Sequence, residues 1–168
     1  MLSRRTLTIS SIGALIAGGA LARAWAAGGS AQKFEVTKTP EEWKKLLTPV
    51  QYNVLRDHGT ERPFTSPYDK LYEPGTYNCA GCDLPLFSSE TKYDSRTGWP
   101  SFWKPLDNAV LTKDDRTLFF LRTEYHCRRC GGHQGHVFED GPKPTGLRYC
   151  NNGVALKFIP ADKAKTPS

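Results

Sequence analysis

CAGCD at residues 79–83 and CRRCGG at residues 127–132 each hold two cysteines three positions apart, followed at once by residues that favour a turn. Two such turns can bring four thiolates together around Zn²⁺ in the tetrahedral arrangement of structural zinc sites. The 44 residues between Cys82 and Cys127 exceed the usual zinc-ribbon spacing of about 15–20 residues. The pattern therefore favours a four-cysteine zinc site, and disulfides remain the alternative.

The free energies of the two kinds of crosslink differ. A disulfide within one Cys-x-x-Cys contributes only ~2 kcal/mol in the chain-entropy model, and disulfides that cross between the pairs contribute ~4 kcal/mol each. A structural zinc site contributes ~10–16 kcal/mol in zinc-finger peptides at neutral pH. We therefore predict one structural Zn²⁺ per chain, held by Cys79, Cys82, Cys127 and Cys130.

Two short helices are predicted on the N-terminal side of the first cysteine pair, within residues 40–58. Thr39-Pro40-Glu41-Glu42 has the order of a capping box: a threonine that can cap, a proline at the first helical position and a glutamate at the third. Thr48-Pro49-Val50-Gln51 repeats that arrangement. Gly59 is placed to end the second helix.

The sequence of the remainder of the chain is typical of turns and short strands. Residues 76–79, 110–112 and 117–125 are predicted to be extended, with a turn at 113–115. Val154, Leu156 and Phe158 alternate with small or polar residues, as in a half-buried strand. The predicted fold class is mainly β, with antiparallel sheets forming a small zinc-stabilised β domain with short N-terminal helices.

The first 26 residues are predicted to be an export signal peptide. Arg4 and Arg5 precede an uncharged run over 7–22, and AWA at 24–26 supplies a small-x-small cleavage site. The arginine pair resembles a twin-arginine signal, which predicts export, to the periplasm of a bacterium. The alternative is an uncleaved anchor, but the uncharged run is shorter than the ~20 residues that span a bilayer.

The predicted domain organisation follows from this assignment. Residues 27–38 are expected to form a flexible leader, residues 39–160 one catalytic domain, and residues 161–168 a C-terminal tail. Removing the signal removes three arginines and no acidic residue, so the net charge falls from +6 to +3. A charge this small does not indicate a nucleic-acid partner.

The fifth cysteine, Cys150, lies outside both pairs, in GLRYCNNG at residues 146–153. A nucleophilic thiolate needs cationic or hydrogen-bonding neighbours, and Arg148, Asn151 and Asn152 can supply them. Upstream, GGHQGHVFEDGP contains two histidines that can transfer protons and an aspartate that can orient one of them, namely His133, His136 and Asp140. The alternatives are a buried structural cysteine, histidines satisfied by backbone contacts, and histidines as metal ligands.

The segment TGWPSFW at residues 97–103 is rich in aromatic residues. Trp99 can form an apolar wall for a methyl group, or it can stack on a nucleic-acid base. The low net charge of the chain without its signal disfavours nucleic acid. Core packing is the alternative, above all for Phe102.

Over residues 38–160, the chain resembles the type B methionine sulfoxide reductases. The motifs that carry this resemblance are GWPSFW, the paired CAGC and CRRC, GGHQGHVFEDGP and TGLRYCNNG. The resemblance implies a zinc-stabilised β fold that reduces the R epimer of methionine sulfoxide in peptides and proteins. It implies zinc ligands at the four paired cysteines and a nucleophile at Cys150. It also implies a substrate pocket with polar surroundings, formed by Trp99, Phe138, His133, His136, Asp140, Arg148 and Asn152.

Thiolate attack on a protonated sulfoxide releases methionine and leaves cysteine sulfenic acid. Many members of the family carry a resolving cysteine just before GWPSF, where this chain has Thr97. We therefore expect Cys150 to depend on an external thiol, either a thioredoxin-like protein or a small thiol. The expected partners are oxidised proteins or peptides and this reductant, with no nucleic acid, and the chain is expected to be a monomer.

Two other functions fit the same residues. A zinc-knuckle binding module would leave Cys150 replaceable and use Trp99 and Trp103 as a docking patch. A thiol–disulfide oxidoreductase would use one Cys-x-x-Cys as its redox pair, but the chain lacks the thioredoxin-like βαβ context.

Overall fold

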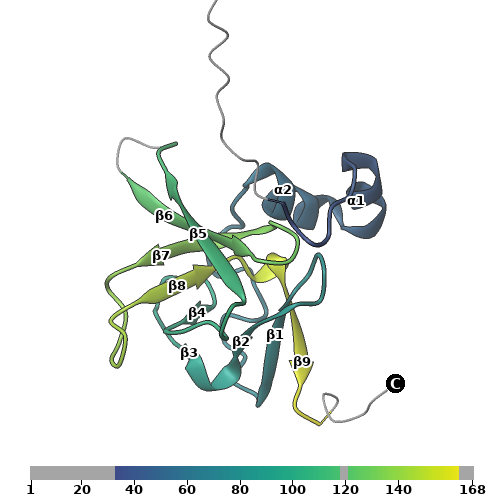
Figure 1. Ribbon diagram of the computed structural model, residues 1–168. Coiled ribbons are helices and arrows are strands. Elements are labelled where there is room, and N and C mark those ends of the chain that lie inside the picture. Colours follow the sequence, from purple (N-terminus) through teal and green to yellow (C-terminus); the bar gives the residue numbers. More distant parts are fainter. Residues whose placement is uncertain (1–32, 118–120, 163–168) are drawn as a thin grey trace, which may run out of the picture. The chain divides into compact units, whose positions relative to one another are not determined.

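The structure is a computed structural model that describes residues 33–117 and 121–162 (Figure 1). The described helical elements are α1 (Pro40–Leu46), α2 (Pro49–Asp57) and the 3₁₀ turns η1 (Ser89–Thr91) and η2 (Gly153–Ala155). The strands are β1 (Gly75–Cys79), β2 (Pro85–Ser88), β3 (Lys92–Tyr93), β4 (Ser101–Phe102), β5 (Val110–Asp115), β6 (Arg122–Cys127), β7 (His133–Phe138), β8 (Arg148–Asn151) and β9 (Leu156–Pro160). Within the described ranges, no helix has the length and apolarity that crossing a membrane requires. The predicted signal peptide lies outside the described residues.

Both predicted helix starts are confirmed. The Thr39 hydroxyl accepts from the Glu42 N–H at 3.3 Å, and the Glu42 carboxylate accepts from the Thr39 N–H at 2.8 Å. Thr48 and Gln51 make the same reciprocal pair at the start of α2. The second helix ends at His58, which has a left-handed φ of 57°, so that the next residue, Gly59, donates its N–H to Asn53 O.

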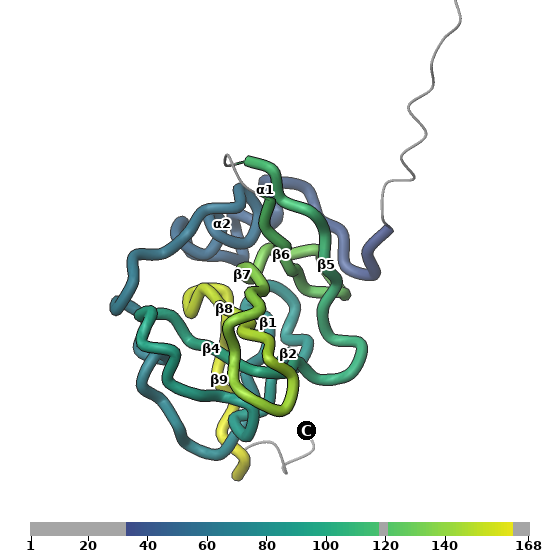
Figure 2. Tube along the Cα trace, turned by 90° about the vertical axis from the view of Figure 1, so that its left-hand side faces the viewer, coloured from purple at the N-terminus to yellow at the C-terminus, as the bar shows by residue number. Residues whose placement is uncertain are grey.

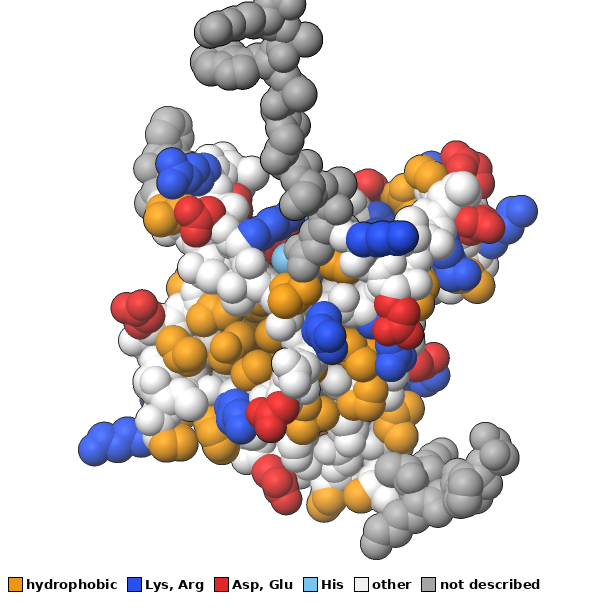
Figure 3. Space-filling model, viewed as in Figure 1, with side chains coloured by type: hydrophobic (Ala, Val, Ile, Leu, Met, Phe, Trp, Pro, Cys, Tyr) orange, Lys and Arg blue, Asp and Glu red, His pale blue; other side chains and the backbone are white. Residues whose placement is uncertain are grey.

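The strands form two antiparallel sheets, which confirms the predicted mainly β class. A three-stranded sheet has the order β2-β1-β9, and a six-stranded sheet has the order β3-β4-β8-β7-β6-β5. Figure 2 shows the chain running from β7 into β8 as a green-to-yellow hairpin. On the face seen in Figure 3, hydrophobic side chains gather in the middle, and basic side chains are scattered among acidic ones.

One row of residues crosses all six strands of the larger sheet. Cys150 of β8 lies opposite His136 of β7 on one side and Ser101 of β4 on the other. Directly opposed residues of antiparallel strands present their side chains on the same face. The complete row is Tyr93, Ser101, Cys150, His136, Glu124 and Lys113.

Aromatic side chains fill the core between the two sheets. Phe87 of β2 stacks on Phe102 of β4 with ring centroids 4.2 Å apart, and Tyr77 of β1 meets Phe102 edge-on at 5.1 Å. All three are fully buried, as is Tyr125 of β6. Such pairs contribute roughly 0.5–1.5 kcal/mol beyond the apolar area that they bury. Phe102 is therefore a core residue, and its neighbour on β8, Tyr149, packs against the same core.

Three sequence-based expectations differ from the structure. Residues 113–115 were expected to turn, yet they continue β5, because Lys113 and Asp115 pair across the sheet with Glu124 and Arg122. Val154 was expected in a strand, but it lies in η2, and β9 begins at Leu156. The strand expected over 117–125 begins at 122, and residues 118–120 lie outside the described part.

The described end of the predicted leader contacts the second cysteine turn. Val36 donates its N–H to Arg129 O at 3.0 Å, and the Phe34 ring meets the His126 ring edge-on. A Cβ on Gly131 would lie 2.5 Å from the Phe34 ring, so the glycine permits this close approach. Residues 33–36 are thus in contact with the folded domain.

Candidate active site and metal centre

Cys150 lies in the middle of the six-stranded sheet and opens into a small cavity. The cavity has a volume of about 140 Å³, enough for the end of one side chain and too small for an organic cofactor. Its lining residues are Thr60, Trp99, Arg122, Gly135, His136, Phe138, Cys150, Asn151 and Asn152. The structure thus brings together the predicted nucleophile Cys150, the aromatic residues Trp99 and Phe138, and the polar residues His136, Asn151 and Asn152 that the sequence indicated.

A fixed guanidinium lies two residues before Cys150 on the same face of β8. Arg148 donates from Nε and Nη2 to the two carboxylate oxygens of Asp140, both at 2.8 Å, and its guanidinium lies 4.3 Å from the centre of the Phe138 ring. The expectation that Asp140 orients a histidine is wrong. The β7–β8 hairpin sets Phe138 opposite Arg148, and this brings the nearby Asp140 within reach of the guanidinium.

The resting state of Cys150 is the neutral thiol. Burial raises the pKa of Cys150, and the opposing effects of the Arg148 guanidinium and of the Thr97 side chain offset that only in part. A thiol with a raised pKa keeps its proton at neutral pH, so attack requires a group that takes the proton when the substrate is bound.

His136 is placed to be that group. Its Nε2 lies 2.7 Å from Asp115 Oδ2, and hydrogen bonds from Thr117, with contacts to His136 and Arg122, hold the pKa of Asp115 well below its usual range. Since an ionised carboxylate only accepts, Nε2 donates and Nδ1 is left to accept a proton. Burial lowers the pKa of His136, and Asp115 partly reverses this. The imidazole is therefore neutral at rest.

Glu61 contacts two residues that line the cavity, Trp99 and Asn152. Its backbone N–H donates to Asn152 Oδ1 at 3.0 Å, and its backbone oxygen accepts from Trp99 Nε1 at 3.1 Å. Its carboxylate accepts from the N–H groups of Gly153 and Val154, although burial raises the pKa of this carboxyl. One residue therefore holds Trp99, Asn152 and the turn that follows Cys150.

His133 lies behind His136 and does not line the Cys150 cavity. Its Nδ1 is 3.0 Å from Glu124 Oε1, and its ring is 5.5 Å from that of His136, centre to centre. It lines a larger groove of about 640 Å³, which shares Thr60, Arg122 and His136 with the cavity. Burial would raise the pKa of Glu124, but contacts with His133, His58 and Lys113 lower it well below its usual range.

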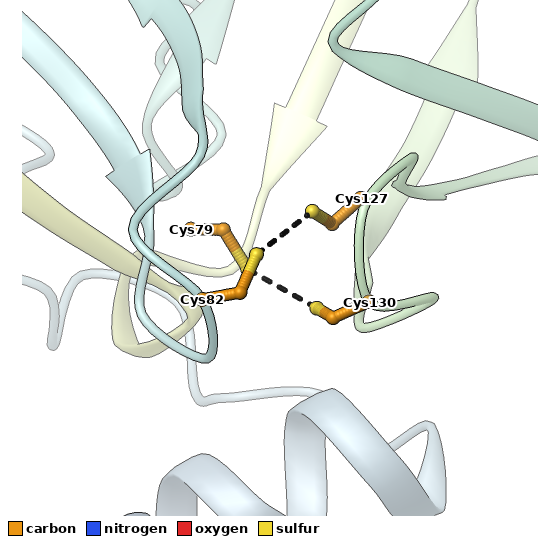
Figure 4. A group of neighbouring side chains, drawn as sticks. All are labelled: Cys79, Cys82, Cys127 and Cys130. Carbon is orange, nitrogen blue, oxygen red and sulfur yellow. Dashed lines mark hydrogen bonds between the residues drawn. The ribbon is translucent and has the colours of Figure 1, made fainter. Parts of the chain in front are cut away.

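The four paired cysteines form one cluster (Figure 4). Cys79 and Cys127 stand at the ends of β1 and β6, and in each turn the N–H four residues on, of Asp83 or Gly131, donates to the carbonyl of the first cysteine at 2.9 Å. Asp83 and Gly131 have left-handed φ values of 57° and 69°. The two turns therefore have the same form, as their sequences predicted.

The spacing of the sulfur atoms fits a metal ion and not disulfides. Cys79 and Cys130 have their sulfurs 3.7 Å apart, and Cys82 and Cys127 have theirs 3.5 Å apart. Tetrahedral bonds of about 2.3 Å place thiolates roughly 3.8 Å apart, whereas a disulfide bond is about 2.05 Å long. All five cysteines are free thiols.

The pKa values of the four cysteines also favour a bound metal ion. Hydrogen bonds from neighbouring thiols lower the pKa of Cys127, and the contact with Cys127 raises that of Cys130. The pKa values of Cys79 and Cys82 are likewise shifted in opposite directions, upward and downward. The four thiols therefore do not all ionise readily together, and a bound divalent cation favours the form with four thiolates. The donor set is therefore suited to a structural metal ion.

Three residues around the cavity were not identified from the sequence. Asp115 was assigned to a turn, Glu61 stands in a loop with no motif of its own, and Glu124 was placed only in a β-rich segment. A signal existed for one of them: with the strands continued to residue 115, the register would have placed Asp115 opposite Arg122.

Comparisons with known proteins give a consistent result. The SelR domain family matches residues 47–160. The chain is 54% identical over 127 residues to "Peptide methionine sulfoxide reductase MsrB" of Agrobacterium fabrum, covering 75% of this chain and 94% of that protein. It is 55% identical over 126 residues to the protein of that name from Leptospira interrogans (74% and 96% covered). It is 52% identical over 137 residues to "Peptide methionine sulfoxide reductase B1, chloroplastic" of Arabidopsis thaliana (80% and 68% covered).

Proposed function

Because the chain belongs to the SelR family and is a peptide methionine sulfoxide reductase of the MsrB type, we propose that it reduces the R epimer of methionine sulfoxide in peptides and proteins, with Cys150 as the nucleophile. The observation that carries this proposal is the position of Cys150: in a small cavity, opposite His136, beside Arg148 and below the Trp99 wall. Family membership argues against a mere zinc-knuckle binding module and against a thioredoxin-like oxidoreductase.

The reaction conserves atoms and electrons. The Cys150 thiol gives its proton to Nδ1 of His136, and the thiolate sulfur attacks the sulfoxide sulfur. His136 returns the proton to the sulfoxide oxygen, and this oxygen passes from the methionine sulfur to the cysteine sulfur as the transient S–S bond breaks. The products are methionine and Cys150 sulfenic acid. The cysteine sulfur is oxidised by two electrons, and the methionine sulfur is reduced by two.

The surroundings of Cys150 support each part of this step. Arg148, held by Asp140, stabilises the thiolate and the developing charge on oxygen. Asp115 holds the tautomer of His136 in which Nδ1 accepts. Trp99 and Phe138 offer apolar walls for the S-methyl group, and we propose that the R epimer is the one whose oxygen faces His136 while the methyl group faces the tryptophan.

We propose that the metal at the four cysteines is one structural Zn²⁺ per chain. When bound, it supplies a crosslink between the turn after β1 and the turn after β6, and it carries no step of the reaction. Two arginines brace these turns, with Arg56 donating to Cys130 O and Arg129 to Cys82 O.

An external thiol completes the cycle in this proposal. Attack of a thiol on the sulfenic acid forms a mixed disulfide and water, and a second thiol then releases Cys150. Thr97 stands where many members of the family carry a resolving cysteine. Its side chain lowers the pKa of Cys150 but cannot form a disulfide. A thioredoxin-like protein or a small thiol would serve as the reductant of a monomeric enzyme.

The test is an assay with pure R and S epimers of a blocked methionine sulfoxide and with dithiothreitol as the reductant. We expect the native chain to reduce the R epimer and to leave the S epimer unchanged, and Cys150→Ser to reduce neither. Equal reduction of both epimers would contradict the epimer assignment. Full activity of Cys150→Ser would contradict the nucleophile.

We also propose export by the twin-arginine route, on the sequence of residues 1–26 alone. Arg4→Lys with Arg5→Lys should keep the charge and abolish export of the folded chain by that route. Fractionation of cells that produce either form checks this, and equal export of the two forms would contradict it.

A further inference from the structure

A second cluster of metal-binding side chains lies outside the Cys150 cavity and contains none of the paired cysteines. His58 at the end of α2, Glu124 of β6 and His133 of β7 each bring one ligand atom to within 4.8 Å of the others. Glu124 Oε1 lies 3.3 Å from His58 Nδ1 and 3.0 Å from His133 Nδ1. These three atoms therefore converge on one point.

Two of the three groups are buried and poorly satisfied. The side chains of Glu124 and His133 are 6% and 2% exposed. Within the described residues, Glu124 Oε1 and both ring nitrogens of His133 have no partner in hydrogen-bonding geometry, despite the 3.0 Å separation. Buried polar atoms normally have such partners. Glu124 Oε1 and His133 Nδ1 are therefore close together without forming a hydrogen bond. A cation bound between these two atoms would satisfy both.

The donor set and its access both suit a transition metal. Two imidazoles and one carboxylate are a recurrent ligand set for Zn²⁺, with an open position for water, and bonds of about 2.0–2.2 Å place such ligands roughly 3.3–3.6 Å apart. The other Glu124 oxygen is held by Lys113 at 3.1 Å, so Oε1 is free to bind. His58 is 49% exposed and lies on the 640 Å³ groove, which gives an ion a path in.

We propose that His58, Glu124 and His133 form a second, exchangeable site for Zn²⁺ or a similar divalent transition metal, and that a bound ion slows the reductase. The link to the reaction is the His133 ring, which contacts the ring of His136. An ion on Nδ1 of His133 holds a positive charge beside His136 and opposes the protonation of His136. This inhibitory half rests on the proposed role of His136.

Binding is tested on enzyme whose four-cysteine site is already filled, in a Cys150→Ser background that removes the remaining thiol. Calorimetry should detect one further equivalent of Zn²⁺, and Co²⁺ in its place should show no thiolate charge-transfer band. His58→Asn should weaken this binding by more than about 100-fold, since even outer partners of a metal ligand are worth roughly 10–100-fold. Asparagine also tolerates the left-handed backbone at this position.

Two further variants bracket the result. Asp57→Asn removes a charge from the same groove without removing a ligand, and it should bind Zn²⁺ nearly as well as the parent. Lys113→Gln removes the cation next to Glu124 and should bind Zn²⁺ more tightly. Absence of a second equivalent, equal binding by His58→Asn, or a thiolate band with the second ion would each overturn the site.

Inhibition is measured on the enzyme with Cys150 intact, with a phosphine as the reductant because dithiols bind zinc. The parent should lose activity as the second equivalent binds and regain it with a mild chelator, whereas His58→Asn should keep its activity at the same Zn²⁺ concentration. Equal inhibition of both would overturn the inhibitory role. Failure of the proposed function would look different, since activity on the R epimer would then be missing before any zinc was added.

Discussion

Cys150 and His136 lie directly opposite each other on neighbouring strands, β8 and β7, of the six-stranded sheet. Opposed side chains of an antiparallel pair share a face, with Cβ atoms about 4.5–5.5 Å apart. The distance between Cys150 and His136 is thus set by the hydrogen-bond ladder, and no loop needs to move to bring them together. The register of two strands therefore places the nucleophile and the proton acceptor that we propose.

Cys150→Ser should abolish reduction of the R epimer while the protein stays folded and keeps its metal. A serine hydroxyl fits the position but is too weak a nucleophile to attack the sulfoxide. The measurement pairs the activity assay with circular dichroism and metal content. Loss of folding along with activity would instead assign Cys150 a structural role.

Asp115→Asn should change the pH dependence of kcat/KM in a defined direction. Burial raises the pKa of Cys150 and lowers that of His136, so the resting pair is thiol and neutral imidazole. The reacting pair, thiolate and imidazolium, carries the same number of protons. The rate should therefore be constant between the two pKa values. It should fall as pH drops through the pKa of His136 and as pH rises through that of Cys150.

The contact with Asp115 raises the pKa of His136, so removing the carboxylate lowers it further. The acid limb of the profile should move to lower pH, and the plateau should drop by about tenfold for each pKa unit lost, because the imidazolium form becomes rarer. Asp114→Asn is the matched control, since Asp114 is exposed and pairs with Arg116. An acid limb that moves to higher pH, or the same change in both variants, would contradict this role of Asp115.

The parts of the fold that the sequence predicted are those governed by neighbouring residues. The two capping boxes and the two cysteine turns depend on residues within four positions, and each has the expected form. The polar contacts around Cys150 are different, because they depend on strand register. Asp115 holds His136 from a strand 21 residues away in sequence, and Asp140 holds Arg148 across a hairpin.

Glu61 illustrates the same limit. Its neighbours in sequence contain no motif for an active site, and its partners Trp99, Asn152 and Gly153 lie 38 to 92 residues away. Two of its three roles are played by its backbone, which any residue type provides. Only the folded chain can therefore reveal that the loop containing Glu61 holds the Trp99 side chain.

Glu61→Ala should raise KM more than it lowers kcat. The N–H groups of Gly153 and Val154 lose their acceptor, so the loop that contains Glu61 is held less firmly. The carbonyl of Glu61 then orders the Trp99 indole less well, and the apolar wall of the cavity is weakened. Glu61→Gln keeps one acceptor oxygen and should show a smaller change in KM. Steady-state kinetics with the R epimer checks both variants, and an unchanged KM in Glu61→Ala would remove Glu61 from this positioning role.

Cys79→Ser or Cys130→Ser should lose the metal and melt at a much lower temperature, or aggregate. The cluster joins β1 of the small sheet to β6 of the large one, so its binding free energy is folding free energy. Thermal unfolding and metal content of the purified variants are the measurements. A variant without metal that melts like the parent would contradict a structural metal site.

Thr97→Cys should change how the oxidised enzyme is recycled. The Thr97 side chain is near enough to lower the pKa of Cys150, so a thiol at that position would lie near the sulfenic acid. The variant should form an internal disulfide after one turnover, if the two sulfurs reach bonding geometry. It should then use a thioredoxin-like donor better than the parent does, while dithiothreitol serves both.

The parent enzyme should end a single turnover without any disulfide. Reduced enzyme, given one equivalent of the R epimer and no reductant, should gain one oxygen on the peptide that contains Cys150, and dimedone should trap it as the sulfenic acid. Thr97→Cys under the same conditions should instead lose two hydrogens across residues 97 and 150. The parent could also lose two hydrogens, with a bridge from Cys150 to one of the paired cysteines. That outcome would mean that a metal ligand doubles as the resolving thiol, and the requirement for an external thiol at the first recycling step would be wrong.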